Sequence, residues 1–304
     1  MKTGLTTLML SILLMGCAQT NRPGSIERNI SMNSEYIGNR LIDVWLPQDY
    51  SNEKSYAVLY MQDGEMVFDA EHAWNGQSWN AHLTAGKLMH EEKIRDMIIV
   101  AIRNGGYARH SEYFPQKVFE QLSATEQEQV IQSTRPNGSS VFNGFKIQSD
   151  NYLRFLVEEL KPHIDSTYST HRDAANTFIA GSSMGGLISC YAVCEYPEVF
   201  GGAACLSTHW PGIFLTDNNP VPAQIFEYLK SNLPAPGSHK FYFDHGTVTL
   251  DSMYPKLQNE VNEIMSAKGY TGDNFKTLVF KGASHTEKSW AERFDIPLKF
   301  LLSK

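Results

Sequence analysis

The chain alternates between short runs of nearly continuous apolar residues and longer stretches in which apolar residues return every three or four positions. The short runs predict buried strands, and the longer periodicity predicts amphipathic helices. The predicted strands are Glu27–Ser34, Arg40–Leu46, Tyr56–Gln62, Met97–Arg103, Phe178–Ala180, Gly201–Leu206, Lys240–Asp244 and Phe275–Phe280. The predicted helices are Trp79–Glu92, Ser149–Tyr168 with Ser149 as N-cap, Val221–Ser231, Asp251–Lys268 and Ser289–Leu302. This alternation predicts an α/β fold with a doubly wound, mostly parallel sheet in one domain, residues 27–304.

The clearest motif lies where an apolar run gives way to helical spacing. Phe178–Ala180 are followed by Gly181-x-Ser183-x-Gly185, and apolar residues return with helical spacing from Leu187. A serine between two glycines, at a turn from strand to helix, is typical of a nucleophile elbow. The glycines let strand and helix approach closely, and the hydroxyl stands at the positive end of the helix dipole. The pattern predicts Ser183 as a nucleophile; the alternative is a small-residue turn without chemistry.

Such a serine needs a base and an acid, which follow it in the order serine, acid, histidine. His285 lies in a glycine-containing loop after the last predicted strand, where the base is expected. Two carboxylates, Asp244 and Asp251, are available for the acid. Asp244 ends a strand, whereas the turn at Gly246 lets the segment that contains Asp251 fold back toward His285. Both assignments stay open at this point.

Acyl transfer also needs two N–H donors for the oxyanion of the tetrahedral intermediate. One donor is expected from Met184, the residue after the nucleophile. The other is expected from the loop after the strand Tyr56–Gln62, with the N–H of Glu65 as first choice and that of Gly64 as second.

One long segment, Asn104–Gln148, interrupts the alternation of strands and helices. It is largely polar between Gln116 and Gly144, with one helical pattern near Ser123–Gln132. Loops of this length inside a compact domain are usually functional or mobile. We interpret the segment as a cap over the elbow; the alternative is a disordered surface insertion.

The N-terminal residues form a separate unit. Lys2 precedes a mostly apolar stretch, Leu5–Met15, which is too short to span a bilayer and is typical of a signal peptide. The sequence Leu14-Met15-Gly16-Cys17 resembles a bacterial lipobox. This resemblance implies removal of residues 1–16, lipid attachment to Cys17, and a place in the cell envelope, on the outer membrane of a Gram-negative host. Residues 17–26 would form a tether; the alternative is an ordinary signal peptide.

The composition limits the classes of partner and cofactor that the chain is expected to bind. The 304 residues carry a net charge of −7 and no basic cluster, which argues against nucleic-acid binding. The cysteines after position 17 are Cys190, Cys194 and Cys205, and they form no C-x-x-C or Cys/His cluster. The sequence therefore predicts no metal site and no cofactor. The lipid anchor is the one membrane contact expected.

Several stretches together resemble the esterase D superfamily of α/β-hydrolases, which includes siderophore, feruloyl and acetylxylan esterases, S-formylglutathione hydrolases and mycolyltransferases. The matching stretches are Arg40–Pro47 with Tyr50, Leu59–Phe68, Arg109 with Glu112-Tyr113 and Pro115, Gly181–Leu187, Asp244–Asp251 and Gly282–Trp290. The resemblance implies an α/β-hydrolase fold with Ser183 as nucleophile, His285 as base and an oxyanion donor after Asp63-Gly64. It also favours Asp251 as the acid, although several relatives carry the acid closer to the turn glycine. The long polar insertion is not part of the family pattern.

These residues predict a serine carboxylic-ester hydrolase with a Ser183–His285–Asp251 triad, acting on a small-molecule or oligosaccharide ester of a sugar, phenolic acid or siderophore. Two alternatives stay open: an acyltransferase on the same triad, and a non-catalytic surface lipoprotein that binds a ligand. Loops expected above the elbow carry candidate substrate contacts, which are otherwise ordinary loop residues. They are Tyr107, Arg109 and Trp210, together with Tyr113 and His209.

Overall fold

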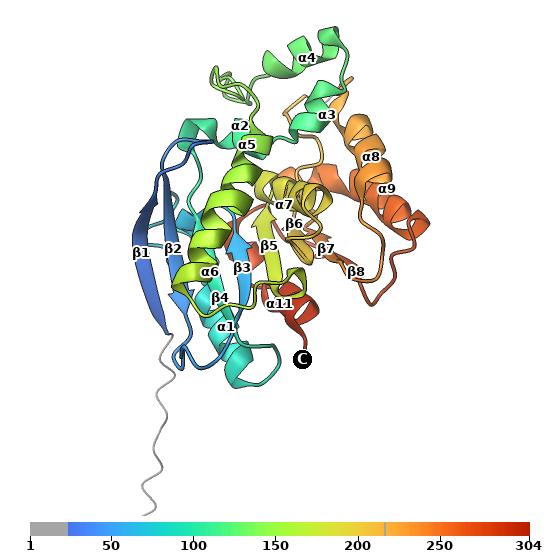
Figure 1. Ribbon diagram of the computed structural model, residues 1–304. Coiled ribbons are helices and arrows are strands. Elements are labelled where there is room, and N and C mark those ends of the chain that lie inside the picture. Colours follow the sequence, from blue (N-terminus) through green and yellow to red (C-terminus); the bar gives the residue numbers. More distant parts are fainter. Residues whose placement is uncertain (1–23, 216) are drawn as a thin grey trace, which may run out of the picture.

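The computed structural model describes residues 24–215 and 217–304, which form one sheet between helices (Figure 1). The strands of this part of the chain are β1 (Ser25–Met32), β2 (Arg40–Leu46), β3 (Ala57–Met61), β4 (Met97–Ile102), β5 (Thr177–Ser182), β6 (Gly202–Leu206), β7 (Lys240–His245) and β8 (Phe275–Val279). Their order across the sheet is β1-β2-β4-β3-β5-β6-β7-β8. β2 pairs antiparallel with β1 and β4, and all other neighbours are parallel. The predicted mostly parallel sheet is confirmed.

Helices cover both faces of this sheet. The α-helices are α1 (Ala81–His90), α2 (Arg109–Tyr113), α3 (Gln116–Glu120), α4 (Ala124–Ile131), α5 (Ser149–Arg154), α6 (Lys161–Thr167), α7 (Met184–Glu195), α8 (Val221–Asn232), α9 (Tyr254–Ala267), α10 (Glu287–Ala291) and α11 (Asp295–Leu302). Alternate residues of β3 join two different apolar clusters, as strand geometry requires. Val58 and Tyr60 pack with residues of α5 to α9, and Leu59 and Met61 pack with residues of α1 and α11. The central strands are buried on both faces, which explains their continuous apolar runs.

The segment between β4 and α5 is folded rather than irregular. It contains α2, α3 and α4, and Ser123 caps α4 in a capping box with Glu126. The helical pattern near 123–132 is thereby confirmed. The segment places these buried apolar side chains in the main core: Val118, Leu122, Val130, Val141 and Phe142. In Figure 1, α3 and α4 rise above α7 and α8. The insertion is an ordered part of the domain.

Two predicted helices differ from expectation in their bounds, and each contains a proline. α9 begins at Tyr254, after a 3₁₀ turn at Thr249–Met253, and the predicted closing helix is divided into α10 and α11. Pro255 and Pro297 both lie in the first turn of their helices. Proline is tolerated there because its missing N–H has no intrahelical acceptor to serve.

The predicted N-cap at Ser149 is wrong. Gln148 holds the N-cap position of α5, and Ser149 is its first helical residue. The Ser149 hydroxyl instead accepts a hydrogen bond from the N–H of Gln116 at 2.8 Å. It therefore fastens the start of α3 to α5. The helix continues through a π-helical turn, Phe155–Leu160, into α6.

The predicted signal peptide and Cys17 lie outside the described residues, as does most of the tether, so these assignments stay predictions. Within residues 24–215 and 217–304, no helix is both long enough and apolar enough to cross a membrane.

Candidate active site

Ser183 connects β5 to α7 with a strained backbone. Its φ is 57° and its ψ is −123°, a region that residues other than glycine rarely occupy. The flanking glycines follow from close contacts. A Cβ on Gly181 would lie 2.6 Å from the carbonyl carbon of Gly185, and a Cβ on Gly185 would lie 3.1 Å from the Cβ of Gln62. The structure thus forms the sharp strand-to-helix turn that the motif predicted.

The carboxylate of Asp251 contacts the imidazole of His285. The distance between His285 Nδ1 and Asp251 Oδ1 is 2.5 Å, and because a carboxylate only accepts, Nδ1 carries the proton. The second oxygen of Asp251 accepts from the Ser207 hydroxyl at 2.6 Å and from the Gly246 N–H at 2.5 Å. Burial alone would raise the pKa of Asp251, but the hydrogen bonds from His285 and Ser207 outweigh burial and lower it. The carboxylate is therefore charged and held in one orientation.

Asp244, the other candidate acid, is bound elsewhere. The Arg293 guanidinium donates two hydrogen bonds to its carboxylate, from Nε to Oδ2 at 3.0 Å and from Nη2 to Oδ1 at 2.8 Å. The Tyr242 hydroxyl donates to Oδ2 at 2.9 Å. Burial raises the pKa of Asp244, and the Arg293 guanidinium opposes that rise. Geometry thus brings Asp251, rather than Asp244, to His285.

The two predicted oxyanion donors lie in the first turns of neighbouring helical segments. Met184 is the first residue of α7, and Glu65 lies in a 3₁₀ turn, Gly64–Met66; N–H groups at such positions have no intrahelical acceptor. The loop touches the elbow, because a Cβ on Gly185 would lie 3.2 Å from Asp63 Oδ2. Burial and the charge of Asp63 raise the pKa of Glu65, although contacts with its own N–H and that of Asn104 oppose this. The Glu65 carboxylate thus lies near its own N–H, and the choice between Glu65 and Gly64 stays a prediction.

The candidate substrate residues lie in different surroundings. Tyr107 is 79% exposed and free to meet a ligand. Arg109 is anchored to Asp63, with Nη2 2.7 Å from Oδ2, and its guanidinium lies 5.0 Å from the ring centroid of Tyr113, which is fully buried. The prediction that Trp210 contacts the substrate is wrong. Its ring is buried, its Nε1 donates to Gln258 Oε1 at 2.9 Å, and it supports the core rather than a substrate surface.

Two aromatic rings that the sequence did not assign enclose His285. The ring centroids of Tyr254 and Trp290 lie 5.9 Å and 5.0 Å from that of His285, both in edge contacts. The Tyr254 hydroxyl is 2.9 Å from His209 Nδ1. Burial raises the pKa of Tyr254 well above its usual value and the charge of Asp251 adds to this, whereas the Ser183 hydroxyl opposes it. Tyr254 follows Asp251 by three residues, a spacing that could have drawn attention to it.

Buried histidines make the fold sensitive to acid. Burial, with the nearby His285, lowers the pKa of His209 to about 3, and burial lowers that of His110 well below its usual range. The unfolded chain therefore binds protons below pH 6.5 that the folded chain excludes. Stability is fully present above pH 6.5 and is lost as the pH falls toward 3, by up to about 1.4 kcal/mol per pH unit for each histidine.

We therefore expect His209→Asn to make the free energy of unfolding depend less steeply on pH. In urea titrations at pH 4 to 7, the slope should fall by the equivalent of about one bound proton. The same change at exposed His90 is the control and should leave the slope as in the wild type. A slope unchanged in His209→Asn would contradict the assignment of neutral His209.

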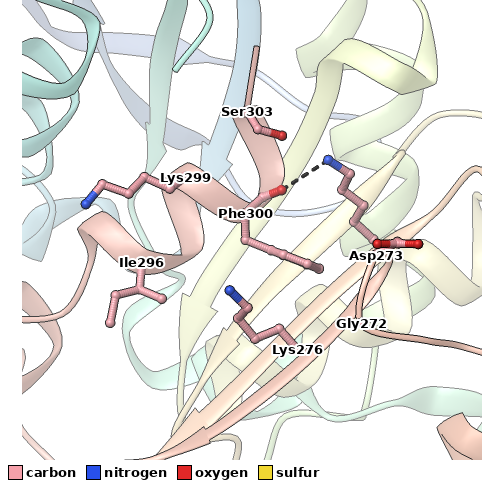
Figure 2. A pocket seen from close by; sticks show the side chains of 8 residues that line it. Gly272, Asp273, Lys276, Ile296, Lys299, Phe300 and Ser303 are labelled. Carbon is pink, nitrogen blue, oxygen red and sulfur yellow. Dashed lines mark hydrogen bonds between the residues drawn. The ribbon is translucent and has the colours of Figure 1, made fainter. Parts of the chain in front are cut away.

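The cavity shown in Figure 2 lies at the other end of the strands. It is lined by Lys240, Gly272, Asp273, Lys276, Ile296, Lys299, Phe300 and Ser303. Lys240 begins β7, whereas Asp244 and His285 belong to the carboxyl end of the sheet. None of the candidate catalytic residues lines this cavity, so it is separate from the site around Ser183.

Comparison with known proteins gives a family match, a sequence relative and solved structures of similar fold. The model of the family described as "Putative esterase" matches residues 34–295. The uncharacterized protein YbbA of Bacillus subtilis strain 168 is 22% identical over 281 residues, which cover 90% of this chain and 97% of that protein. A solved ferulic acid esterase superposes with a TM-score of 0.64 and 17% identity, over 91% of this chain and 97% of its own. The enterobactin esterase of Shigella flexneri, solved with 2,3-di-hydroxy-N-benzoyl-glycine, gives a TM-score of 0.62 and 15% identity, over 91% of this chain and 59% of its own.

The strand order, the elbow and the histidine–carboxylate pair define an α/β-hydrolase of the serine esterase class. Because the family match spans most of the sequence, the chain belongs to this esterase family and is a serine carboxylic ester hydrolase.

Proposed function

We propose that Ser183, His285 and Asp251 form the catalytic triad of this hydrolase. The observation that carries the proposal is the 2.5 Å contact between His285 Nδ1 and Asp251 Oδ1, in a chain whose elbow serine has a strained backbone. With Nδ1 protonated, Nε2 is the free base of the imidazole. It accepts the Ser183 proton as the hydroxyl oxygen attacks the ester carbonyl.

The remaining steps use the same groups. The N–H groups of Met184 and Glu65 bind the oxyanion that develops on the carbonyl oxygen. His285 then donates its proton to the leaving alcohol, and an acyl-enzyme stays on Ser183. A water molecule, deprotonated by His285, attacks the acyl carbon. His285 then returns this proton to the Ser183 oxygen as the acyl–oxygen bond breaks, which releases the acid and restores the free serine. Tyr254 and Trp290 pack against the ring of His285, whose side chain is 14% exposed, and limit its contact with water.

We propose further that the substrate is an ester carrying a hydroxylated aromatic ring. The support comes from the chemistry named for two structural neighbours: one is a ferulic acid esterase, and the other was solved with a dihydroxybenzoyl ligand. Exposed Tyr107 offers a ring on which such a group can stack. This proposal concerns the acyl or alcohol group and does not alter the triad.

Two measurements test the proposal. A fluorophosphonate probe followed by peptide mass spectrometry should label Ser183, and Ser182→Ala, which removes the adjacent hydroxyl, should label equally well. In a panel of esters, we expect kcat/KM for methyl ferulate or a tricatechol siderophore to exceed that for acetylated xylan by at least about tenfold. Labelling at another residue would refute the triad, and equal rates across the panel would refute the aromatic substrate class.

A further inference from the structure

Ser207, for which no sequence pattern predicts a role, occupies a constrained position beside the proposed acid. It directly follows β6, and its φ is +44°, a left-handed conformation that serine rarely adopts. Its side chain is fully buried, and its N–H donates to the carbonyl oxygen of Asp244 at 2.7 Å. Backbone strain of this kind persists only where surrounding contacts hold it. The residue therefore lies between the two carboxylates that competed for the role of acid.

The direction of the Ser207 hydrogen bonds is fixed by its partners. The hydroxyl oxygen lies 2.9 Å from Trp290 Nε1 and 3.1 Å from Arg293 Nη2. Both of these groups are donors only, so they occupy the two lone pairs of the hydroxyl. The hydroxyl proton is left for Asp251 Oδ2, at 2.6 Å. A hydroxyl that ordinarily rotates is thus locked as a donor to the acid.

The same hydroxyl connects two ion pairs. Arg293 Nη2 contacts both the Ser207 oxygen and Asp244 Oδ1, so the guanidinium polarises the O–H bond toward Asp251. On Asp251, Oδ2 is filled by Ser207 and the Gly246 N–H, which leaves Oδ1 to face His285. The side chains of Ser207, Asp244, Asp251 and Arg293 are all buried. In such surroundings a hydrogen bond to a charged group is stronger than in water.

We propose that Ser207 is a positioning residue of the hydrolase: its hydroxyl holds the Asp251 carboxylate in register with His285 and transmits the positive charge of Arg293 to it. The proposal rests on the triad proposed above. The hydroxyl bond spreads part of the negative charge of Asp251 away from the imidazole. Without it, the carboxylate attracts the imidazolium proton more strongly, and the orientation of the carboxylate plane is held by Gly246 alone.

The test uses two substitutions at this position. Ser207→Ala keeps the strained φ, whereas Ser207→Gly relieves it, because glycine adopts positive φ readily. We expect both variants to lower kcat for p-nitrophenyl acetate about tenfold with little change in KM, as expected for losing one hydrogen bond to a charge. Both should also move the midpoint of the acid limb of the pH dependence of kcat/KM to higher pH. Ser207→Gly should keep the higher melting temperature of the two.

The matched control is Ser189→Ala, another buried serine, whose hydroxyl donates to the Gly185 carbonyl at 2.7 Å and does not reach Asp251. It should leave the acid limb where it is. An acid limb that is unchanged or moved to lower pH in folded Ser207→Ala and Ser207→Gly overturns the proposal, even if both variants melt earlier. The triad itself is tested on the wild type, where failure of the probe to label Ser183 would refute it. Normal labelling of the wild type, together with an unchanged acid limb in the Ser207 variants, would refute only the positioning role of Ser207.

Discussion

Ser183→Ala is expected to lower kcat for p-nitrophenyl acetate by at least about 10⁴-fold, the largest effect foreseen for one substitution in this chain. Without the hydroxyl no acyl-enzyme can form, and only binding and the oxyanion donors remain to accelerate hydrolysis. Alanine meets the same backbone strain as serine at φ 57° and ψ −123°. The variant should therefore fold, with a melting temperature close to that of the wild type.

Initial rates and thermal melts of purified protein check this expectation. Ser182→Ala is the matched control, since Ser182 is the neighbouring serine at the end of β5. It should keep most of the wild-type rate. Retention of more than a tenth of that rate by Ser183→Ala would mean that the nucleophile is another residue.

The elbow could be predicted from sequence because its physics is local. A buried strand, a turn with φ above zero and a helix must follow one another within a few residues. A Cβ at position 181 would clash with the backbone of Gly185, and one at position 185 would press on Gln62 and Asp63. The parallel sheet could be predicted for a related reason, since strands buried on both faces require continuous apolar runs. His285 followed from its place after the last strand.

The surroundings of these residues could not be predicted, because they depend on contacts between distant segments. The sequence predicts Trp210 on a substrate loop, yet its indole is buried and hydrogen-bonded to Gln258, 48 residues later in the chain. Ser207 received no role, because its partners Trp290 and Arg293 come from the C-terminal helical region. Periodicity gives no information on such pairings. The same limit left Asp244 and Asp251 as alternatives until geometry separated them.

Asp251→Asn is expected to lower kcat by about 10⁴-fold, the value that the corresponding change costs in serine proteases. The amide keeps the shape of the carboxylate but cannot accept from all of its present donors. His285 Nδ1 then loses its charged acceptor, so the imidazole is no longer held with Nε2 free, and the imidazolium formed during attack is not stabilised. The melting temperature should fall little, because the side chain still fills the same space. Rates on p-nitrophenyl acetate and thermal melts measure both effects.

Asp244→Asn should show the reverse balance. Asp244 and Arg293 are both buried, and removing one charge leaves the other without its partner, at a cost of about 3–5 kcal/mol. We expect a clear drop in melting temperature, with a loss of kcat well under that of Asp251→Asn at a temperature where both variants are folded. The smaller loss of kcat would arise because Ser207 connects the two carboxylates: its N–H donates to Asp244 and its hydroxyl donates to Asp251. If Asp244→Asn instead lost more activity than Asp251→Asn while still folded, the acid would be Asp244. His285 would then have to leave its present 2.5 Å contact with Asp251 during catalysis.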